Sequence, residues 1–326
     1  MGATDDVTKE YMKDNNVFAD AFNYLIYNGR QVIKPSSLQE LDTTEIALVE
    51  DDKIQKYRDV LKSAVIKKND KATYLLLGVE NQTKIHYAMP VRNLLYDAIR
   101  YHTQIIDVAK RHKKDKDLST KSEFLSGFSK EDKIMPIITL VIHFGPDKWD
   151  GPLSLHDMFE VDDVDILAFV PDYKMNLIDP ADLDDSSLDK FSTGLSKLLG
   201  CIKYSKDKEG LAKYFMKDGG LIVDVKTAQA INDLTKLNLS IPEGKEEINM
   251  CKAMEELIKD GEARGEARGE ARGESNGAIK TLIGLVKDGL LSVKDAAPRA
   301  GMTESQFREE MKKVGTSGSL DSMNLF

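Results

Sequence analysis

Two acidic residues and one amide have the types and spacing best suited to chemistry in this sequence. Asp59 precedes Glu80, and Gln82 follows Glu80 two positions later. Side chains alternate along an extended chain, so Glu80 and Gln82 point to the same side of a strand. Magnesium binds one or two carboxylates and keeps several waters, and such a cation activates water for phosphodiester hydrolysis. Asp59, Glu80 and the Asn81 backbone carbonyl are therefore candidate metal ligands, with Gln82 placed to orient the attacking water.

The strands predicted around these residues bring the two carboxylates together. Residues 74–80 form a short apolar run with a β-branched end, which is typical of a buried strand. We interpret residues 56–65 as the preceding strand and residues 67–71 as a hairpin turn, so that Asp59 and Glu80 lie on neighbouring antiparallel strands. Residue types alone do not establish a metal site, because carboxylates on paired strands are more often solvated surface groups.

A long amphipathic helix is predicted to pack behind this strand. Pro90 breaks the chain, and apolar residues then recur at helical spacing from Val91 to Ala109. An earlier helix is expected to end in a left-handed turn at Asn28-Gly29. Further strands are predicted over residues 46–49, 134–144 and 165–170, and further helices over residues 14–27, 188–202, 210–216, 225–237, 245–259 and 278–287.

Composition limits the classes of protein to which the chain can belong. The 326 residues suffice for roughly two domains, and 41% hydrophobic with 31% charged residues is an ordinary soluble mixture. No apolar run is long enough to span a membrane, no signal peptide is evident, and two isolated cysteines fit a reducing compartment. We therefore expect a cytoplasmic protein without a membrane partner. The net charge of −9 argues against broad attraction to nucleic acid, so DNA contact requires a local basic patch or a bound cation.

The motifs around the two carboxylates resemble a known family. The sequence resembles the PD-(D/E)XK nuclease superfamily and, more closely, the bacterial Rpn-type recombination-promoting nucleases, also called PD-(D/E)XK nuclease family putative transposases. The resemblance covers essentially the whole chain. Its core consists of Arg58-Asp59, Glu80-x-Gln82, Met89-Pro90-Val91-Arg92 and Tyr96-Asp97, and residues 18–23, 42–45 and 145–155 agree with it.

This resemblance implies both a fold and an activity. The implied fold is an α/β, restriction-endonuclease-like core, with a mixed central sheet flanked by helices and a small all-helical C-terminal segment. The implied activity is magnesium-dependent cleavage of double-stranded DNA linked to recombination or transposition, with manganese as the alternative cation. Asp59 falls on the first motif acid and Glu80 on the second, while Gln82 takes the place of the superfamily's lysine.

The resemblance also implies further site residues. An acid on the first helix often completes such sites, and Asp20 is the best match here, with Asp14 as the other candidate. Gln82 carries no charge, so positive charge must come from the metal or from Lys84 or Arg92. A basic cluster at the end of the long helix supplies further candidate contacts to the DNA backbone, although a solvated helix end is the commoner meaning of such a cluster. These candidates are Lys110, Arg111, Lys113 and Lys114.

Two alternative functions belong to different classes. The chain can be a catalytically weak or inactive nuclease-fold protein that acts as a DNA-binding or regulatory factor, as the acidic pI of about 5.3 and the uncharged Gln82 suggest. A purely structural assembly factor is the other alternative, and it rests only on the repeat and the tail described next.

The C-terminal quarter differs in composition from the rest. We assign residues 1–244 to the nuclease-like domain, 245–275 to a Gly-Glu-Ala-Arg repeat that is a linker or a helix, 276–314 to a helical tail and 315–326 to disorder. Each repeat glycine costs about 1 kcal/mol in a helix, and like charges stack at i,i+4, which favours a linker or a marginal helix. Two capping boxes, Ser292 to Asp295 and Thr303 to Gln306, outline a helix-turn-helix without a clear positive face. We expect it to serve regulation or homo-oligomerisation.

Overall fold

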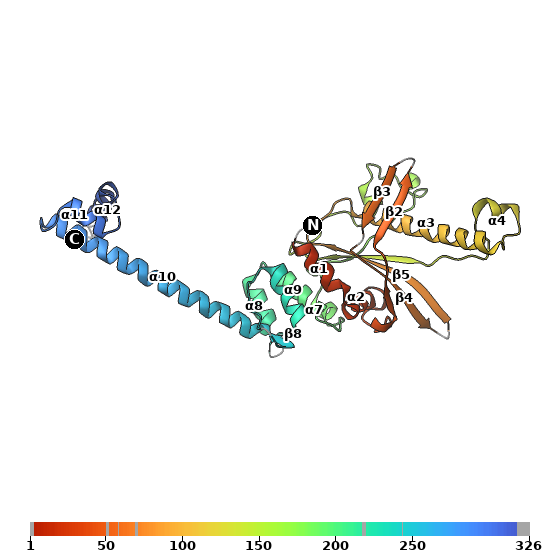
Figure 1. Cartoon of the computed structure of the whole chain (residues 1–326), viewed down its shortest axis with the longest axis horizontal. Helices are drawn as coiled ribbons and strands as arrows, with labels where there is room; N and C mark the ends of the chain where they lie inside the picture. The colour runs from red at the N-terminus through yellow and green to blue at the C-terminus, as the bar shows by residue number, and fades with distance from the viewer. Residues whose placement is uncertain are drawn as a thin grey trace. The chain divides into compact units, whose positions relative to one another are not determined.

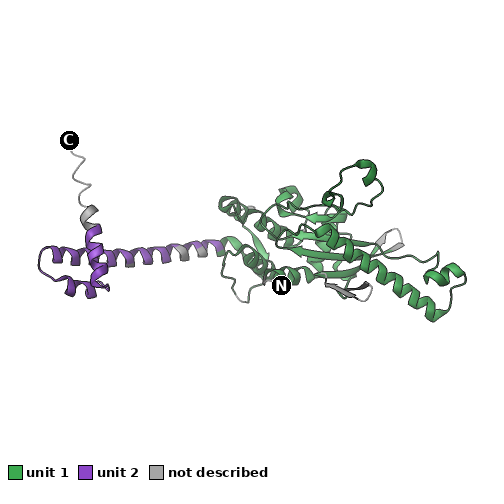
Figure 2. Cartoon of the chain, turned by 90° about the horizontal axis from the view of Figure 1, so that it is seen from above, with its two compact units in different colours: residues 1–253 green, residues 254–326 purple. Residues whose placement is uncertain are grey.

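The computed structural model describes residues 3–49, 52–57, 59–68, 71–216, 220–242 and 244–317. The chain divides into two compact units, residues 1–253 and residues 254–326 (Figure 2). Within the described residues, no helix combines the length and the apolar character needed to cross a bilayer.

A mixed sheet forms the centre of unit 1. In the described part of the chain its five strands lie in the order β1-β4-β5-β6-β7. β1, β4 and β5 are antiparallel neighbours, whereas β5, β6 and β7 run parallel. This arrangement confirms the predicted mixed α/β sheet flanked by helices (Figure 1). The strands are β1 Leu38–Glu40, β4 Val60–Lys68, β5 Lys71–Gln82, β6 Ile137–His143 and β7 Asn176–Ile178.

The predicted hairpin between the two site strands is present, but the first strand is interrupted. β4 pairs with β5 from Val60 opposite Val79 to Lys68 opposite Lys71. The single strand expected over residues 56–65 is instead two strands, because β3 (Asp52–Tyr57) leaves the central sheet and pairs with β2 (Thr44–Val49). Arg58 lies outside the described residues. Asp59 therefore lies just before β4, at the point where the chain changes sheets.

Helices cover both faces of the central sheet (Figure 1). α3 (Met89–Asp115) begins one residue before Pro90, close to the predicted start, and packs on one face, where Asp97 accepts a hydrogen bond from Thr139 of β6. On the opposite face, the Lys62 ammonium of β4 donates to Asn15 and lies over the Phe18 ring. That face is covered by α2 (Asn15–Tyr27), which matches the predicted first helix, and by α1 (Ala3–Lys13), which was not predicted.

The prediction of a third buried strand over residues 165–170 is wrong. Its residues form part of the short helix α5 (Val164–Leu167) and the turn after it, and Phe169 is 90% exposed. The Asp163 carboxylate caps this helix by accepting hydrogen bonds from the backbone N–H groups of Asp165 and Ile166, which favours a helical turn over an extended chain. β7 provides the fifth strand of the sheet instead.

The remaining described elements of unit 1 are helical, apart from one two-stranded sheet of β8 and β9.

Three further helix predictions fall in this part of unit 1. The helix predicted over residues 188–202 is split into two helices by residues 189–194, and the helices predicted over residues 210–216 and 225–237 are confirmed within a few residues. The elements not yet given are η1 Pro35–Ser37, α4 Lys121–Ser126, η2 His156–Met158, η3 Pro180–Asp182, α6 Asp185–Leu188, α7 Leu195–Tyr204, α8 Lys208–Met216, β8 Ile222–Asp224, α9 Val225–Thr235 and β9 Glu247–Asn249.

Unit 2 contains the predicted helix-turn-helix. α11 (Val293–Arg299) and α12 (Glu304–Ser317) pack on the end of α10 (Met250–Lys287) around the buried Phe307 side chain. The predicted capping box of Thr303 and Gln306 forms, since the two residues exchange hydrogen bonds. Ser292 also caps its helix by accepting from the Asp295 N–H, but the Asp295 carboxylate accepts from the Ser292 hydroxyl and not from the Ser292 backbone N–H. Helix α12 extends through residues 315–317, which were expected to be disordered, and residues 318–326 lie outside the described part.

The Gly-Glu-Ala-Arg repeat is helical and not an irregular linker. Residues 261–272 lie inside α10, which continues without a break on both sides of them. A Cβ atom added at Gly265, Gly269 or Gly273 would meet nothing within 4 Å. These glycines therefore weaken the helix without making a close contact that would require them within this chain.

Replacing these three glycines with alanine should stabilise α10. Each change is expected to add up to about 1 kcal/mol of helix stability, because alanine loses less backbone entropy and no neighbour opposes its methyl group. Helix content followed by far-UV circular dichroism during heating will measure this gain. Gly194→Ala is the control, since its Cβ would lie 2.2 Å from the Thr227 hydroxyl and should destabilise the fold. Unchanged helix content in the triple variant would contradict the prediction.

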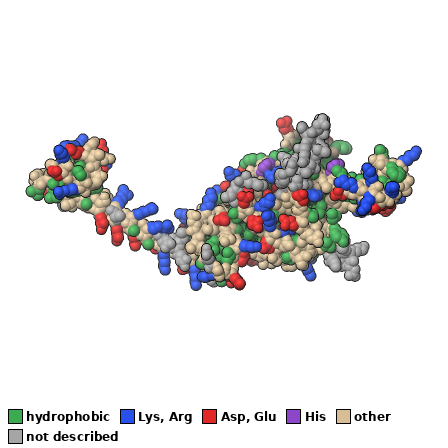
Figure 3. Space-filling model, in the orientation of Figure 1, with side chains coloured by type: hydrophobic (Ala, Val, Ile, Leu, Met, Phe, Trp, Pro, Cys, Tyr) green, Lys and Arg blue, Asp and Glu red, His purple; other side chains and the backbone are tan. Residues whose placement is uncertain are grey.

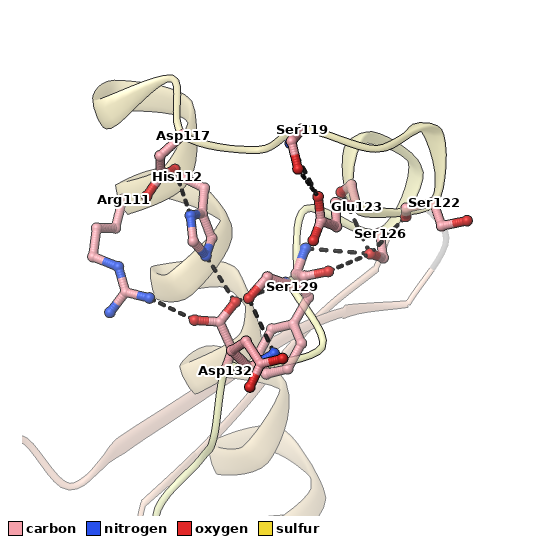
Figure 4. Close-up of polar contacts among 11 residues, drawn as sticks. Arg111, His112, Asp117, Ser119, Ser122, Glu123, Ser126, Ser129 and Asp132 are labelled. Carbon is pink, nitrogen blue, oxygen red and sulfur yellow. Dashed lines mark hydrogen bonds and ion pairs between the residues drawn. The ribbon is translucent and has the colours of Figure 1, made fainter.

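A network of polar contacts holds the far end of α3 against the segment that follows it (Figure 4). The buried His112 imidazole bridges two carboxylates, with 2.6 Å from Nδ1 to Asp117 and 2.7 Å from Nε2 to Asp132. Arg111 donates to the same Asp132 carboxylate at 2.8 Å. The two carboxylates raise the pKa of His112 above its ordinary value, because each stabilises the protonated imidazole that bridges them.

This bridge should make stability depend on pH. A His whose pKa is raised on folding contributes stability that is complete below its unfolded pKa of about 6.5 and is lost as pH rises through its folded pKa. The difference in urea unfolding free energy between the wild type and His112→Gln should therefore be largest near pH 6 and smaller near pH 9. His102→Gln, an exposed position on the same helix, serves as the control. A difference that grows with pH would exclude the cationic bridge.

Candidate functional site

Asp59 and the end of β5 meet where the β4–β5 ladder begins. One Asp59 carboxylate oxygen accepts a hydrogen bond from the Asn81 backbone N–H at 2.8 Å. Burial raises the pKa of the Asp59 carboxyl, and this effect outweighs the Asn81 N–H and the nearby Arg92 charge, which lower it. The structure thus brings Asp59 to the strand that carries Glu80, as the sequence predicts.

Glu80 is fully buried and paired with a cation. Its carboxylate lies 3.1 Å from the Arg92 guanidinium, and Arg92 also donates from Nε to the Tyr96 hydroxyl at 2.9 Å. Burial alone would lower the pKa of Arg92, but the Glu80 charge raises it above its ordinary value. Arg92 is therefore a fixed positive charge between the buried carboxylate and the solvent.

A cavity of about 460 Å³ opens at this end of the sheet. Five of the eleven predicted site residues line the cavity, while the fully buried Glu80 is not among the lining residues. The Asn81 side-chain amide is buried without a hydrogen-bond partner among the described residues, so it can bond a ligand or a water there. The lining residues are Thr4, Asp5, Asp59, Asn81, Gln82, Thr83, Lys84 and Arg92.

An acidic residue missed by sequence analysis lies at the cavity. Asp5 of α1 accepts a hydrogen bond from the Thr83 hydroxyl at 3.2 Å, and its charge helps to raise the pKa of Asp59. Asp5 and Asp6 in the first turn, followed by Val7 and Tyr11 at helical spacing, were the available signal for α1.

Asp20, the predicted first-helix acid, has a different role. Its buried carboxylate accepts hydrogen bonds from the backbone N–H and the hydroxyl of both Ser192 and Thr193, at 2.6–3.0 Å. It is not among the residues that line the cavity. The alternative, Asp14, caps α2 and pairs with Lys226 at 3.5 Å. The expectation for this helix is therefore corrected, and Asp5 of α1 is the acid that the structure brings to the cavity.

The predicted basic cluster is not brought to the cavity. Arg92 and Lys113 lie on the same continuous helix, about 30 Å apart at 1.5 Å per residue. Lys110 pairs with Asp107 at 3.6 Å, and Arg111 pairs with Asp132. Only Lys84 and Arg92 of the predicted DNA contacts therefore lie at the cavity itself.

The donor atoms near the cavity match the preferences of magnesium. Among the described residues, no group of three or more His, Cys, Asp or Glu side chains is arranged to hold a metal ion. Asp59, Glu80 and the Asn81 carbonyl nevertheless offer hard oxygen donors, and magnesium needs only one or two carboxylates because it keeps most of its waters. These residues fit a hydrated divalent cation better than a zinc ion, which requires several nitrogen or sulfur ligands.

Comparison with known proteins gives one match. The family model described as "Putative transposase, YhgA-like" matches residues 3–231, a segment that contains the whole cavity. Comparison with curated proteins and with solved structures gave no match.

Replacing Asp20 should impair stability and leave metal binding intact. Asp20→Asn is expected to cost about 2–4 kcal/mol of unfolding free energy, because the amide cannot accept from all of the donors that surround the carboxylate. Urea unfolding measures this loss, and calorimetric titration with manganese measures binding. Asp14→Asn is the matched control, since asparagine keeps the helix cap. If Asp20→Asn had normal stability but no longer bound manganese, the prediction would be wrong and Asp20 would be a metal ligand.

Proposed function

The chain belongs to the YhgA-like putative transposases, a family of the PD-(D/E)XK and Rpn type, and on this premise we propose that it is a metal-dependent DNA endonuclease. The proposed reaction is hydrolysis of a phosphodiester bond in double-stranded DNA during transposition or recombination. The observation that carries the proposal is the convergence of Asp59, Asn81 and two cationic side chains on one cavity at the end of the sheet. Glu80, the residue before Asn81, is buried and paired with Arg92, which lines this cavity.

Asp59, Glu80 and the Asn81 carbonyl are the proposed ligands of magnesium or manganese. The bound cation would supply Lewis-acid stabilisation of the phosphate and lower the pKa of a bound water. Gln82 lines the same cavity, and its side-chain amide would orient the attacking water by hydrogen bonding. Asp5, which lines the same cavity and accepts a hydrogen bond from Thr83, adds a carboxylate that can accept a proton or hold a second water.

Lys84 and Arg92 are the proposed contacts to the scissile phosphate. Gln82 cannot carry the positive charge that a lysine would supply at this position, so the developing negative charge must meet another cation. The Arg92 guanidinium is fixed by Glu80 and Tyr96 and faces the cavity, which gives it a defined position without loss of further side-chain entropy. Lys84 follows β5 and adds a second positive charge at the cavity wall.

One observation favours the alternative of a non-catalytic nuclease-fold protein that binds DNA. Glu80 is fully buried and already neutralised by Arg92, so a cation that used Glu80 would compete with an internal ion pair. A protein of this class would bind DNA through Lys84 and Arg92 and would not cleave it.

Cleavage of supercoiled plasmid tests these two functions. The wild type should nick plasmid with magnesium or manganese and not with chelator, and Asp59→Asn or Glu80→Gln should reduce the rate at least about a hundredfold. Asp150→Asn, an exposed acid outside the cavity, should retain the wild-type rate. Circular dichroism must show that each variant is folded. Chelator-resistant nicking would contradict the proposal, and metal-independent plasmid binding without nicking in any metal would establish the non-catalytic alternative.

A further inference from the structure

Unit 1 exposes an apolar segment that its own fold does not cover. Residues 159–169, here called the acidic-apolar segment, carry five large hydrophobic side chains whose exposed fractions range from 38% to 90%. The sequence of residues 165–170 is apolar enough to predict a buried strand, yet Val164 is 78% exposed and Phe169 is 90% exposed. Several large apolar side chains exposed within one short segment are typical of an interaction site. The five side chains are Phe159, Val161, Val164, Ile166 and Phe169.

Two more large apolar side chains are exposed in a region of unit 1 that is rich in basic residues. The short helix α4 and the end of α3, residues 110–126, form what we call the basic tip. At this tip Phe124 is 67% exposed and Leu125 is 91% exposed. In Figure 3, hydrophobic and basic side chains lie together at the end of the molecule that carries α4.

The basic tip is held in one conformation by its own hydrogen bonds (Figure 4). Thr120 and Glu123 form a complete capping box, and Gly127 ends α4 with a positive φ of 65°. The backbone N–H groups of Ser119 and Thr120 lower the pKa of Glu123 to about 2. The bridge from His112 to Asp117 and Asp132 ties this segment to α3. These contacts hold the backbone that carries the exposed Phe124 and Leu125 side chains. A partner that covers the two side chains therefore loses less conformational entropy in ordering this segment.

The charges around the two surfaces are opposite. In the acidic-apolar segment, four carboxylates form no ion pair with any described residue; they belong to Glu160, Asp162, Asp163 and Asp165. At the basic tip, four lysines and the Asp115 carboxylate form no ion pair within the described part of the chain, so the unpaired charge is positive overall. The lysines are Lys113, Lys114, Lys116 and Lys121. Uncompensated charge of opposite sign beside exposed apolar side chains makes the two surfaces electrostatically complementary.

We propose that two copies of this chain associate through these surfaces, with the basic tip of each copy against the acidic-apolar segment of the other. A two-fold axis makes this contact twice and closes the assembly as a dimer. DNA is the competing partner for the tip lysines, but it would leave the acidic-apolar segment uncovered and would be repelled by its carboxylates. A second copy satisfies both surfaces at once. This proposal does not depend on nuclease activity.

Sedimentation equilibrium of the full-length protein measures the association. The wild type should be a dimer whose dissociation constant rises with salt. Phe124→Asp with Leu125→Asp, or Ile166→Asp with Phe169→Asp, should weaken the dimer at least about tenfold, since each pair removes the apolar centre of the contact. Leu290→Asp is the matched control, because Leu290 is 72% exposed and lies in unit 2. A monomeric wild type, or a dimer that survives both double substitutions, would overturn the proposal.

Charge reversal identifies which surfaces meet. A tip variant, Lys113→Glu with Lys114→Glu, and a segment variant, Glu160→Lys with Asp162→Lys, should each be largely monomeric, because like charges then face each other. An equimolar mixture should form a heterodimer, since every contact in it is attractive. Failure of the mixture to associate would overturn the proposal. A tip variant that keeps its dimer but loses plasmid binding would also overturn it and would assign the tip to DNA.

Discussion

The register of the β4–β5 hairpin is the constraint on which the candidate site depends. Val60 pairs with Val79, so the residue before β4 lies beside the end of β5, where Glu80, Asn81 and Gln82 follow. A slip of one residue would move every side chain of the hairpin to the other face of the sheet. The hydrogen bond from the Asn81 N–H to Asp59 then fixes the carboxylate against the strand end. The geometry of the candidate site is thus set by backbone pairing.

Electrostatics at the site follow from burial. Glu80 is removed from water, and a buried carboxylate is tolerated only with a compensating charge and hydrogen bonds. Arg92, one turn into α3, supplies that charge, and its second contact with Tyr96 holds it at the cavity. Asp59 is less buried, and its raised pKa reflects a carboxyl that would gain from an additional cation. The same arrangement that stabilises the fold therefore leaves the Asp59 carboxylate and the fixed Arg92 charge at the cavity.

Elsewhere, hydrogen bonds and not apolar packing determine local structure. Four donors around Asp20 fix the segment before α7 to α2. Capping boxes and the His112 bridge hold α4 although its two largest apolar side chains face solvent. Polar networks of this kind specify one conformation without a core beneath it, which explains how unit 1 can present apolar residues outward in a defined position.

The sequence by itself determined the features that depend on neighbours along the chain. The β4–β5 hairpin, the start of α3 beside Pro90, the left-handed turn at Asn28 and the helix caps at Ser292 and Thr303 are all local in origin, so periodicity and turn chemistry predict them. Only the tertiary structure decided which acid reaches the cavity. Asp20 and Asp5 both lie on N-terminal helices, and the donors of Ser192 and Thr193, more than a hundred residues away, bind Asp20. The tertiary structure also interrupted the first site strand at Asp59 and left residues 165–170 exposed, because sheet pairing and burial depend on distant partners that no local pattern encodes.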